Sequence, residues 1–441
     1  MANTSLNKTL GTPTNNYKWT ISCWVKRATL GDQTIMSARV DGNNNGRLYF
    51  NSSNQLSIVD YQSTNKMELV TTSVYKDVGA WYNIVVSSDN SIGSPVTKIY
   101  VNGTETTNST NTQYSQNQAN LWNSAIAHYI GQNGASASYF DGSLSHFHFV
   151  DGTAYPASTF GSTDSVTGEW KINTSPSITM GNNGFTILKD GNTITDSSPN
   201  SNNWTLGGGT LSKSEDNPSN VFCTLNPLDV MKQSGGIYVP TFSNGNTTMS
   251  ASATNNYQTF GSIAVDTGKY YWEMKVPNYD PNLGARIGLF HGDNKVHSGS
   301  YYYGADGYNV HQNGSIYTNG SSTSYMATFS DNIIITFALD KTNGLSYVGA
   351  NGYWADGNGN TNQSFANAVA VETKLSTTMP DKTTYAMFDV YGSTTQHINF
   401  GNGYFGTTAV SSAGTNASGN GIFEYDVPSG YTALSTIGLN T

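Results

Sequence analysis

Residues Trp19–Lys26 read WTISCWVK, and the alternation in this stretch decides the fold class. Neighbouring side chains of a β-strand point to opposite faces, so each face takes every second residue. One face carries Trp19, Ile21, Cys23 and Val25, and the other carries Thr20, Ser22, Trp24 and Lys26. The segment therefore predicts a strand whose apolar face lies on a core.

The same pattern continues along the chain. Tyr270–Val276 alternates in the same way, and the β-branched segment Ile333–Leu339 predicts a central strand. Many Asn-Gly and Asp-Gly pairs separate such segments, and these pairs favour the positive φ angles of tight hairpin turns. The only helix-like signal is a short turn near Ser364–Val371. We therefore expect an all-β chain with two antiparallel β-sandwich (jelly-roll) domains in tandem.

The composition excludes several classes of protein. Of the 441 residues only 11% are charged, while 12% are aromatic. The aromatic share argues against disorder. The net charge of −9 and the lack of a basic cluster argue against nucleic acid and anionic membranes as partners. The longest apolar stretch is too short to insert into a membrane. The first residues do not resemble a secretory signal, so we expect synthesis in a cytoplasm.

Composition shifts predict the domain boundaries. We expect a first sandwich with a turn-rich extension over residues 1–228, a junction over 229–240, and a second sandwich over 241–405. The Gly- and Ser-rich stretch that follows predicts a flexible connector, with a short C-terminal tail, over 406–441. Cys23 and Cys223 are far apart, and Cys23 is expected to be a buried free thiol.

The first block resembles the concanavalin-like, laminin-G-like jelly rolls. The resemblance lies in the strings YKWTISCWVKR (Tyr17–Arg27), WYNIVVSSD (Trp81–Asp89), TKIYVNG (Thr97–Gly103) and YIGQNGASASYFDGSLSHFHFVDG (Tyr129–Gly152). The strings that follow, up to NPSNVFCTLNPLD, are similar to those that follow such modules in bacteriophage virion proteins, especially of marine phages. This match covers most of residues 1–229.

The second block resembles a SPRY-type sandwich. The resemblance lies in GKYYWEMKV (Gly268–Val276), ARIGLF (Ala285–Phe290), DNIIITFALDKTNGLSYVGANG (Asp331–Gly352) and FDVYGSTTQHINFG (Phe388–Gly401). The tail string FEYDVPSGYTALSTIGL resembles the closing segment of phage SPRY proteins. Together the resemblances imply a phage structural protein that is exposed on the virion and carries two binding-type sandwiches.

No catalytic residue is predicted. Retaining glycan hydrolysis needs two carboxylates about 5–5.5 Å apart. The chain has seven Glu residues, and none lies in the alternating acidic pattern of laminarinase-type jelly rolls. Glu424 and Asp426 share a strand face but lie in the tail. We therefore expect a protein that is not an enzyme.

Metal binding rests on two weak patterns. Asp141 and Asp151 are the candidate Ca²⁺ ligands of a laminin-G-like loop, because hard cations prefer carboxylate oxygens. Asp-Gly pairs are, however, more commonly hairpin turns. His146 and His148 share a strand face, but zinc needs three or four ligands and a packed pair is the commoner role.

Tyrosines crowd one region of the second block. Sugars stack on aromatic rings and form hydrogen bonds to Asn, Asp and Ser, so these residues are the candidate ligand-binding set. The set is Tyr301, Tyr303, Tyr308, Tyr317, Tyr325, Tyr353 and Trp354. Covering of sheet faces or subunit packing is the commoner use of such residues. Both interpretations stay open.

These observations favour a non-enzymatic protein of the virion surface. The first hypothesis is a tail fibre or appendage that binds a host-surface glycan or protein. A capsid decoration or head fibre is the alternative, and a bacterial lectin or glycanase is a further one. By analogy with phage appendages we expect other virion proteins as partners and a homo-oligomer such as a trimer.

Overall fold

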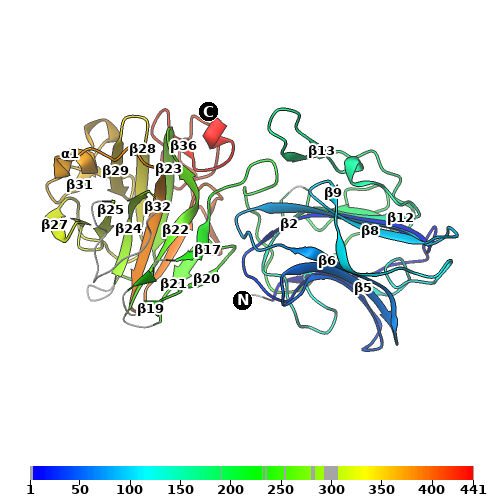
Figure 1. The fold of residues 1–441 in the computed structure, drawn as a ribbon. Coiled ribbons are helices and arrows are strands. Elements are labelled where there is room, and N and C mark those ends of the chain that lie inside the picture. The colour runs from blue at the N-terminus through cyan, green and yellow to red at the C-terminus, as the bar shows by residue number, and fades with distance from the viewer. Residues whose placement is uncertain are drawn as a thin grey trace. The chain divides into compact units, whose positions relative to one another are not determined.

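The computed structural model describes residues 3–440 apart from 190, 231, 234–235, 253–254, 280–283 and 293–305. It is nearly all-β, with 47% strand and 3% helix, which confirms the predicted tandem β-sandwiches. Two compact units form (Figure 1). Unit 1 comprises Met1–Lys213 and Asn217–Ser219, and unit 2 comprises Ser214–Asp216 and Asn220–Thr441. Among the described residues, no helix is long and apolar enough to cross a membrane.

Unit 1 is built from two antiparallel sheets. The eight-stranded sheet has the order β10 (Asn108–Thr112), β6 (Asn65–Val74), β5 (Gln55–Gln62), β4 (Asn44–Phe50), β3 (Gln33–Arg39), β11 (Ala127–Ile130), β1 (Ser5–Thr9), β16 (Thr205–Gly208). The six-stranded sheet has the order β15 (Phe185–Ile187), β12 (Gly142–Asp151), β2 (Lys18–Arg27), β7 (Trp81–Asp89), β8 (Val96–Val101), β9 (Thr104–Glu105).

The core of unit 1 contains the predicted face of the opening segment. Trp19, Ile21, Cys23 and Val25 are fully buried and belong to one apolar cluster. The other face of β2 is also buried, which differs from a simple half-exposed strand. The residues after β12 explain this, because Phe160 and Trp170 from this later segment pack over the six-stranded sheet. Their elements are a 3₁₀ turn (Ala157–Thr159), β13 (Gly161–Thr163) and β14 (Trp170–Ile172).

Unit 2 is the second sandwich. Its seven-stranded sheet has the order β17 (Leu225–Val230), β22 (Asn256–Val265), β32 (Thr384–Tyr391), β24 (Gly284–His291), β25 (Gly307–His311), β26 (Ser315–Thr318), β27 (Ser321–Ser324). Its nine-stranded sheet has the order β20 (Thr241–Ser243), β21 (Thr248–Ser250), β33 (Thr395–Asn399), β23 (Lys269–Val276), β28 (Ile333–Asp340), β29 (Leu345–Ala350), β30 (Tyr353–Ala355), β31 (Thr361–Gln363), with β36 (Thr432–Ala433) beside β23.

Short elements complete unit 2. They are the pairs β18 (Lys232–Gln233) with β19 (Gly236–Ile237) and β34 (Tyr404–Phe405) with β35 (Thr408–Ala409), the 3₁₀ turns Phe365–Asn367 and Gly438–Asn440, and α1 (Val371–Leu375). The expected turn near Ser364–Val371 is therefore present, and it continues into α1. The predicted alternation of Tyr270–Val276 is also confirmed, because Tyr270, Trp272, Met274 and Val276 lie in the core.

The domain boundary differs from the expectation. The two units divide at residues 214–219, not at 229–240. The cause is apolar packing, since Cys223 and Leu225 lie in the core of unit 2 and β17 pairs with β22. Both cysteines are buried and free.

The prediction of a flexible connector is wrong as well. Residues 406–440 fold onto the outer face of the nine-stranded sheet, where Phe423 and Tyr431 pack with Tyr271 and Trp354. Phe423 meets Tyr271 edge to face, with 4.9 Å between the ring centroids. Gly and Ser in this segment supply turns of a packed layer, which composition alone does not distinguish from a loose linker.

Candidate functional site

The candidate tyrosines of unit 2 do not gather on one surface. Tyr301 and Tyr303 lie outside the described residues. Tyr308 and Tyr325 are buried in the core. The Tyr308 hydroxyl lies 2.5 Å from Ser346 Oγ, and the Tyr325 hydroxyl donates to the Val369 carbonyl at 2.6 Å. Their rings therefore serve packing, and neither presents a face to a ligand.

The other members of that set lie apart. Tyr317 is half-buried and stacks on His311, with 3.6 Å between the ring centroids. Trp354 is buried and packs edge to face on Phe365. Tyr353 is 59% exposed, so its ring is accessible to a ligand. Alternation along β30 explains this split, because adjacent side chains leave opposite faces of the strand.

The structure does not fit Asp151 as a Ca²⁺ ligand. Asp151 is buried, and each carboxylate oxygen accepts two N–H bonds. Oδ1 accepts from the Asn15 amide at 3.1 Å and from Asn123 Nδ2 at 2.6 Å. Oδ2 accepts from the Thr14 amide at 2.6 Å and from the Asn183 amide at 3.1 Å. Four donors surround this carboxylate, and a cation would have to displace them.

Asp141 and the histidine pair have local roles. Burial raises the pKa of Asp141, and Thr29 is bonded to its carboxyl. His148 Nδ1 lies 2.8 Å from Thr186 Oγ1, and burial together with the nearby His146 lowers the pKa of His148 to about 3. Among the described residues, no three His, Cys, Asp or Glu side chains are close enough to hold a metal ion. Packing therefore accounts for these side chains.

Sequence reasoning missed the outer face of the eight-stranded sheet. Along β4, β5 and β6 the inward residues are buried, and the outward residues are mostly half-exposed. Outward tyrosines are Tyr49, Tyr61 and Tyr129. The alternation of 44–62 was the signal that could have revealed this face.

Register places these rings around Arg47. Tyr49 lies two residues along β4 from Arg47, and Tyr61 stands opposite Asn45 on the next strand. Tyr129 pairs with Ser37, which in turn pairs with Arg47. With strands about 4.8 Å apart and a rise of about 3.4 Å per residue, Tyr61 and Tyr49 are separated by about 14 Å. The rings thus span several strands of one surface.

Arg47 is held in place on this surface. Its guanidinium lies over the Tyr49 ring, 4.1 Å from the centroid. It also forms two bonds to the Asp32 carboxylate, at 3.1 Å and 2.5 Å. The pKa of Asp32 is lowered by these contacts with Arg47, although burial opposes the shift. The pair is therefore neutral overall, and the face offers aromatic rings among amides and hydroxyls.

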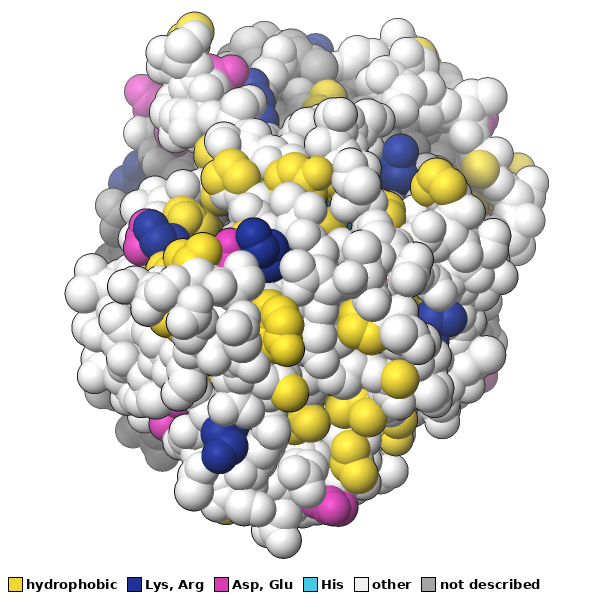
Figure 2. Space-filling view, turned by 90° about the vertical axis from the view of Figure 1, so that its right-hand side faces the viewer, with side chains coloured by type: hydrophobic (Ala, Val, Ile, Leu, Met, Phe, Trp, Pro, Cys, Tyr) yellow, Lys and Arg dark blue, Asp and Glu magenta, His cyan; other side chains and the backbone are white. Residues whose placement is uncertain are grey.

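The low charge of the sequence is visible on the surface. Figure 2 shows one face of the molecule, on which uncharged polar atoms predominate and charged side chains are scattered. Hydrophobic side chains form small groups between them. Such a surface suits hydrogen bonding to neutral ligands more than long-range attraction.

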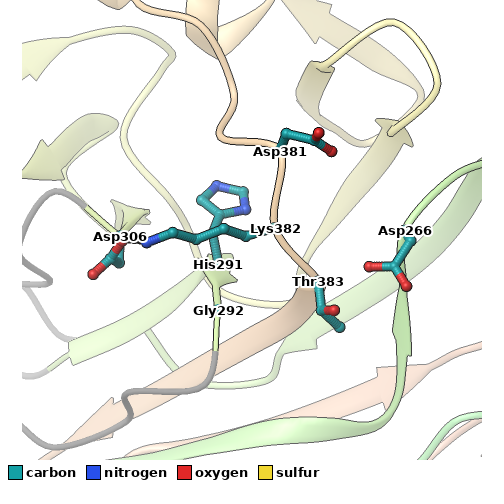
Figure 3. A pocket seen from close by; sticks show the side chains of 7 residues that line it. All are labelled: Asp266, His291, Gly292, Asp306, Asp381, Lys382 and Thr383. Carbon is teal, nitrogen blue, oxygen red and sulfur yellow. Dashed lines mark hydrogen bonds and ion pairs between the residues drawn. The ribbon is translucent and has the colours of Figure 1, made fainter.

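A polar pocket lies at one end of the unit 2 sandwich. It has a volume of about 470 Å³ and is lined by Asp266, His291, Gly292, Asp306, Asp381, Lys382 and Thr383 (Figure 3). These residues come from the ends of β22, β24, β25 and β32 and from the loops beside them. Lys382 Nζ lies 2.5 Å from Asp306 Oδ1.

A comparison with known protein families supports the fold of the first unit. The family model described as the concanavalin A-like lectin/glucanases superfamily matches residues 3–158. No curated protein matches the chain.

Several solved structures align with part of the chain. The SPRY domain of human HERC1 is 18% identical, with a TM-score of 0.31, over 40% of this chain and 96% of that one. The PSpry domain of TRIM65 is 12% identical, with a TM-score of 0.28, over 40% of this chain and 89% of that one. A heptameric SAP-like pentraxin from Limulus polyphemus is 19% identical, with a TM-score of 0.28, over 38% of this chain and 85% of that one. The family model therefore supports a concanavalin A-like sandwich in the first unit.

Proposed function

We propose that this chain is a non-enzymatic glycan-binding protein whose ligand lies on the outer face of the eight-stranded sheet. One observation carries the proposal: this face presents the half-exposed rings of Tyr49, Tyr61 and Tyr129, whereas later segments of the chain cover the outer faces of the six- and nine-stranded sheets. The match of residues 3–158 to a family of lectins and glucanases supports the proposal.

The chemistry of the face suits a neutral sugar chain. Tyrosine rings stack on the C–H faces of sugars, and short polar side chains bond to the hydroxyls. Asn7 and Asn45 share the face with the tyrosines. The separation of about 14 Å between positions 49 and 61 along the sheet favours an extended glycan over a single sugar.

Binding without hydrolysis is part of the proposal. Glu68 is the one outward carboxylate on the described strands of this sheet, and it accepts a bond from Asn65 Nδ2. Asp32 at the sheet end is paired with Arg47. A glycosidase needs two carboxylates with separate roles across the sugar, and this arrangement supports a binding role.

The biological setting rests on the resemblance to phage proteins. We place the protein on a virion surface, as part of a tail fibre or appendage that contacts a host-cell glycan or protein. A capsid decoration or head fibre is the second candidate, and a bacterial lectin is a third. Other virion proteins and identical copies of this chain are the expected partners.

A binding experiment tests the site. Purified protein is applied to an array of bacterial and algal polysaccharides, together with the double variant Tyr61→Ala/Tyr129→Ala and the control Tyr353→Ala. We expect the double variant to bind at least tenfold more weakly, because stacking contributes about 1 kcal/mol or more per ring. Tyr353→Ala removes an exposed ring of unit 2 and should bind as the wild type does.

Two results would contradict the proposal. If Tyr353→Ala abolished binding and the double variant did not, the site would lie on unit 2. Release of reducing ends from a bound polysaccharide would show an enzyme. Soluble protein should also compete with phage adsorption if it binds the host, and a lack of competition at saturating dose favours capsid decoration.

A further inference from the structure

Arg47 stands between the tyrosines on the outer face of the eight-stranded sheet. It pairs with Ser37, which lies opposite Tyr129, and with Val59, which is two residues from Tyr61 on β5. A strand spacing of about 4.8 Å and a rise of about 3.4 Å per residue place its Cα about 10 Å from that of Tyr129 and about 8 Å from that of Tyr61. A glycan that extends from one ring to the other therefore passes Arg47.

Three hydrogen bonds hold the guanidinium of Arg47 in one position. Its Nε donates to Thr34 Oγ1 at 2.7 Å, and its two terminal nitrogens donate to the two carboxylate oxygens of Asp32 at 3.1 Å and 2.5 Å. An arginine side chain has five N–H donors, so two remain, and no described residue accepts a bond from them. The side chain of Arg47 is 19% exposed. These two N–H groups are therefore the donors that it offers to a ligand.

Asp32 cancels the charge of these donors. Burial raises the pKa of Asp32, but hydrogen bonds from Arg47 and Ser138 and the charge of Arg47 lower the pKa below its ordinary value. Asp32 is thus ionised at physiological pH, and its side chain is 39% exposed beside the guanidinium. An anionic group that approached Arg47 would meet this carboxylate, whereas a sugar hydroxyl carries no charge to be repelled.

The other charges of the face balance one another as well. On or beside its strands lie two more cations and two more carboxylates, namely Arg39, Lys66, Asp41 and Glu68. The two ionisable groups that remain on these strands lie on the inward side of the alternation, namely Lys8, which donates to the Asn203 carbonyl, and the buried Asp60. With Asp32 and Arg47 the face has three cations and three carboxylates. Loss of the Asp32 charge would leave one positive charge uncompensated, and Arg47 would carry it.

We propose that Asp32 determines the charge specificity of this face and restricts it to neutral glycans. Asp32 is a positioning residue, because it holds the Arg47 guanidinium at the surface as a donor to sugar hydroxyls. Its carboxylate also disfavours glycans that carry carboxylate or sulfate groups. This inference rests on the proposed glycan-binding function and goes beyond it by naming the residue that selects among glycans.

Affinity electrophoresis with two matched pairs of polysaccharides tests the inference. Hydroxyethyl cellulose and carboxymethyl cellulose form one pair, and laminarin and sulfated laminarin form the other. Within a pair the glucan backbone is shared and only one member is anionic. We expect the wild type to bind a neutral member at least about tenfold more tightly than its anionic partner, because Asp32 occupies and neutralises Arg47.

The variant Asp32→Asn should shift this preference. An amide keeps the shape of the side chain but leaves Arg47 charged, so binding of the anionic member should strengthen at least about fivefold. Binding of the neutral member should change much less. The double variant Asp32→Asn/Arg47→Gln removes both charges and should lose the gain.

Glu169→Gln is the control for net charge. It removes an exposed carboxylate of unit 1 that lies on the β13–β14 hairpin, outside the eight-stranded sheet, and should leave the preference unchanged. Melting curves establish that each variant is folded, and the exposure of Asp32 and Glu169 favours this.

Two results overturn the inference and leave the proposed function intact. One is an unchanged ratio of anionic to neutral affinity in folded Asp32→Asn, and the other is a wild type that prefers the anionic members. In both cases Tyr61→Ala/Tyr129→Ala would still lose binding. If the wild type bound none of the four polysaccharides, glycan binding itself would be contradicted, and this inference with it.

Discussion

In both sandwiches a later segment of the chain covers the outer face of one sheet, and both use a buried carboxylate to fasten loops to a sheet. In unit 1, residues after β12 cover the six-stranded sheet, and Asp151 at the end of β12 accepts four N–H bonds. In unit 2, residues 406–440 cover the nine-stranded sheet, and Glu273 on β23 accepts four hydrogen bonds.

The partners of the two carboxylates differ. Asp151 joins loops that precede β2, follow β10 and precede β15, so it fastens the end of the sandwich. Glu273 accepts from the Glu424 and Tyr425 amides, both at 2.9 Å, so it fastens the covering layer itself. One covered sheet in each unit explains why strands with an alternating sequence are buried on both faces. The outer face of the eight-stranded sheet is the surface on which we propose binding.

The largest effect is expected from the covering layer of unit 2. Phe423→Ala removes a ring that is 1% exposed and packs on Tyr271, which should lower the free energy of unfolding by about 3–5 kcal/mol. The neighbouring Ile422 is 37% exposed, and Ile422→Ala should cost under about 1 kcal/mol. Calorimetry of the two unfolding transitions measures both. Equal, small effects would mean that the layer is only loosely attached.

Removing hydrogen bonds of Asp151 should give the next largest loss of stability. Asp151→Asn puts N–H groups opposite the donors of Thr14, Asn15 or Asn183, and should destabilise unit 1 by about 3 kcal/mol. Asp141→Asn, the matched control, should cost under about 1 kcal/mol. Because N–H donors occupy Asp151, added CaCl₂ should leave the melting temperature of unit 1 unchanged. A rise that depends on Asp151 would restore the calcium hypothesis.

The smallest effect is a pH dependence of unit 2. Burial raises the pKa of Glu273 to about 7 from an ordinary value of 4.5, although its hydrogen bonds oppose the shift. The folded state therefore binds this proton more tightly than the unfolded state does. The stability contributed by protonation is complete below about pH 4.5 and is lost as the pH rises towards 7, by at most about 1.4 kcal/mol per pH unit.

Unfolding of wild type and Glu273→Gln at pH 5 and pH 7.5 measures this contribution. The advantage of the wild type over the variant should shrink as the pH rises. Parallel stability curves for the two proteins would show that Glu273 keeps an ordinary pKa.

Much of the fold followed from residue types. The alternation of Trp19–Lys26 and Tyr270–Val276 identified the strands and the core faces. The sites were harder to predict. Tyrosine is common on binding surfaces, yet Tyr308 and Tyr325 lie in the core. A tyrosine ring can be buried when its hydroxyl forms a hydrogen bond to a buried partner, as both of these hydroxyls do. Tyr353 remains exposed, and a role for it in ligand binding stays a prediction.

The sequence by itself determined that this chain is all-β, that it forms two sandwiches, and which face of each strand meets a core. It did so because strand periodicity and turn chemistry are local properties. Only the tertiary structure decided which sheets are covered on their outer faces and where the two units divide. It also decided which carboxylates accept four hydrogen bonds. Those outcomes depend on contacts such as that of Glu273 with Glu424 and Tyr425, residues about 150 positions apart, which no local pattern encodes.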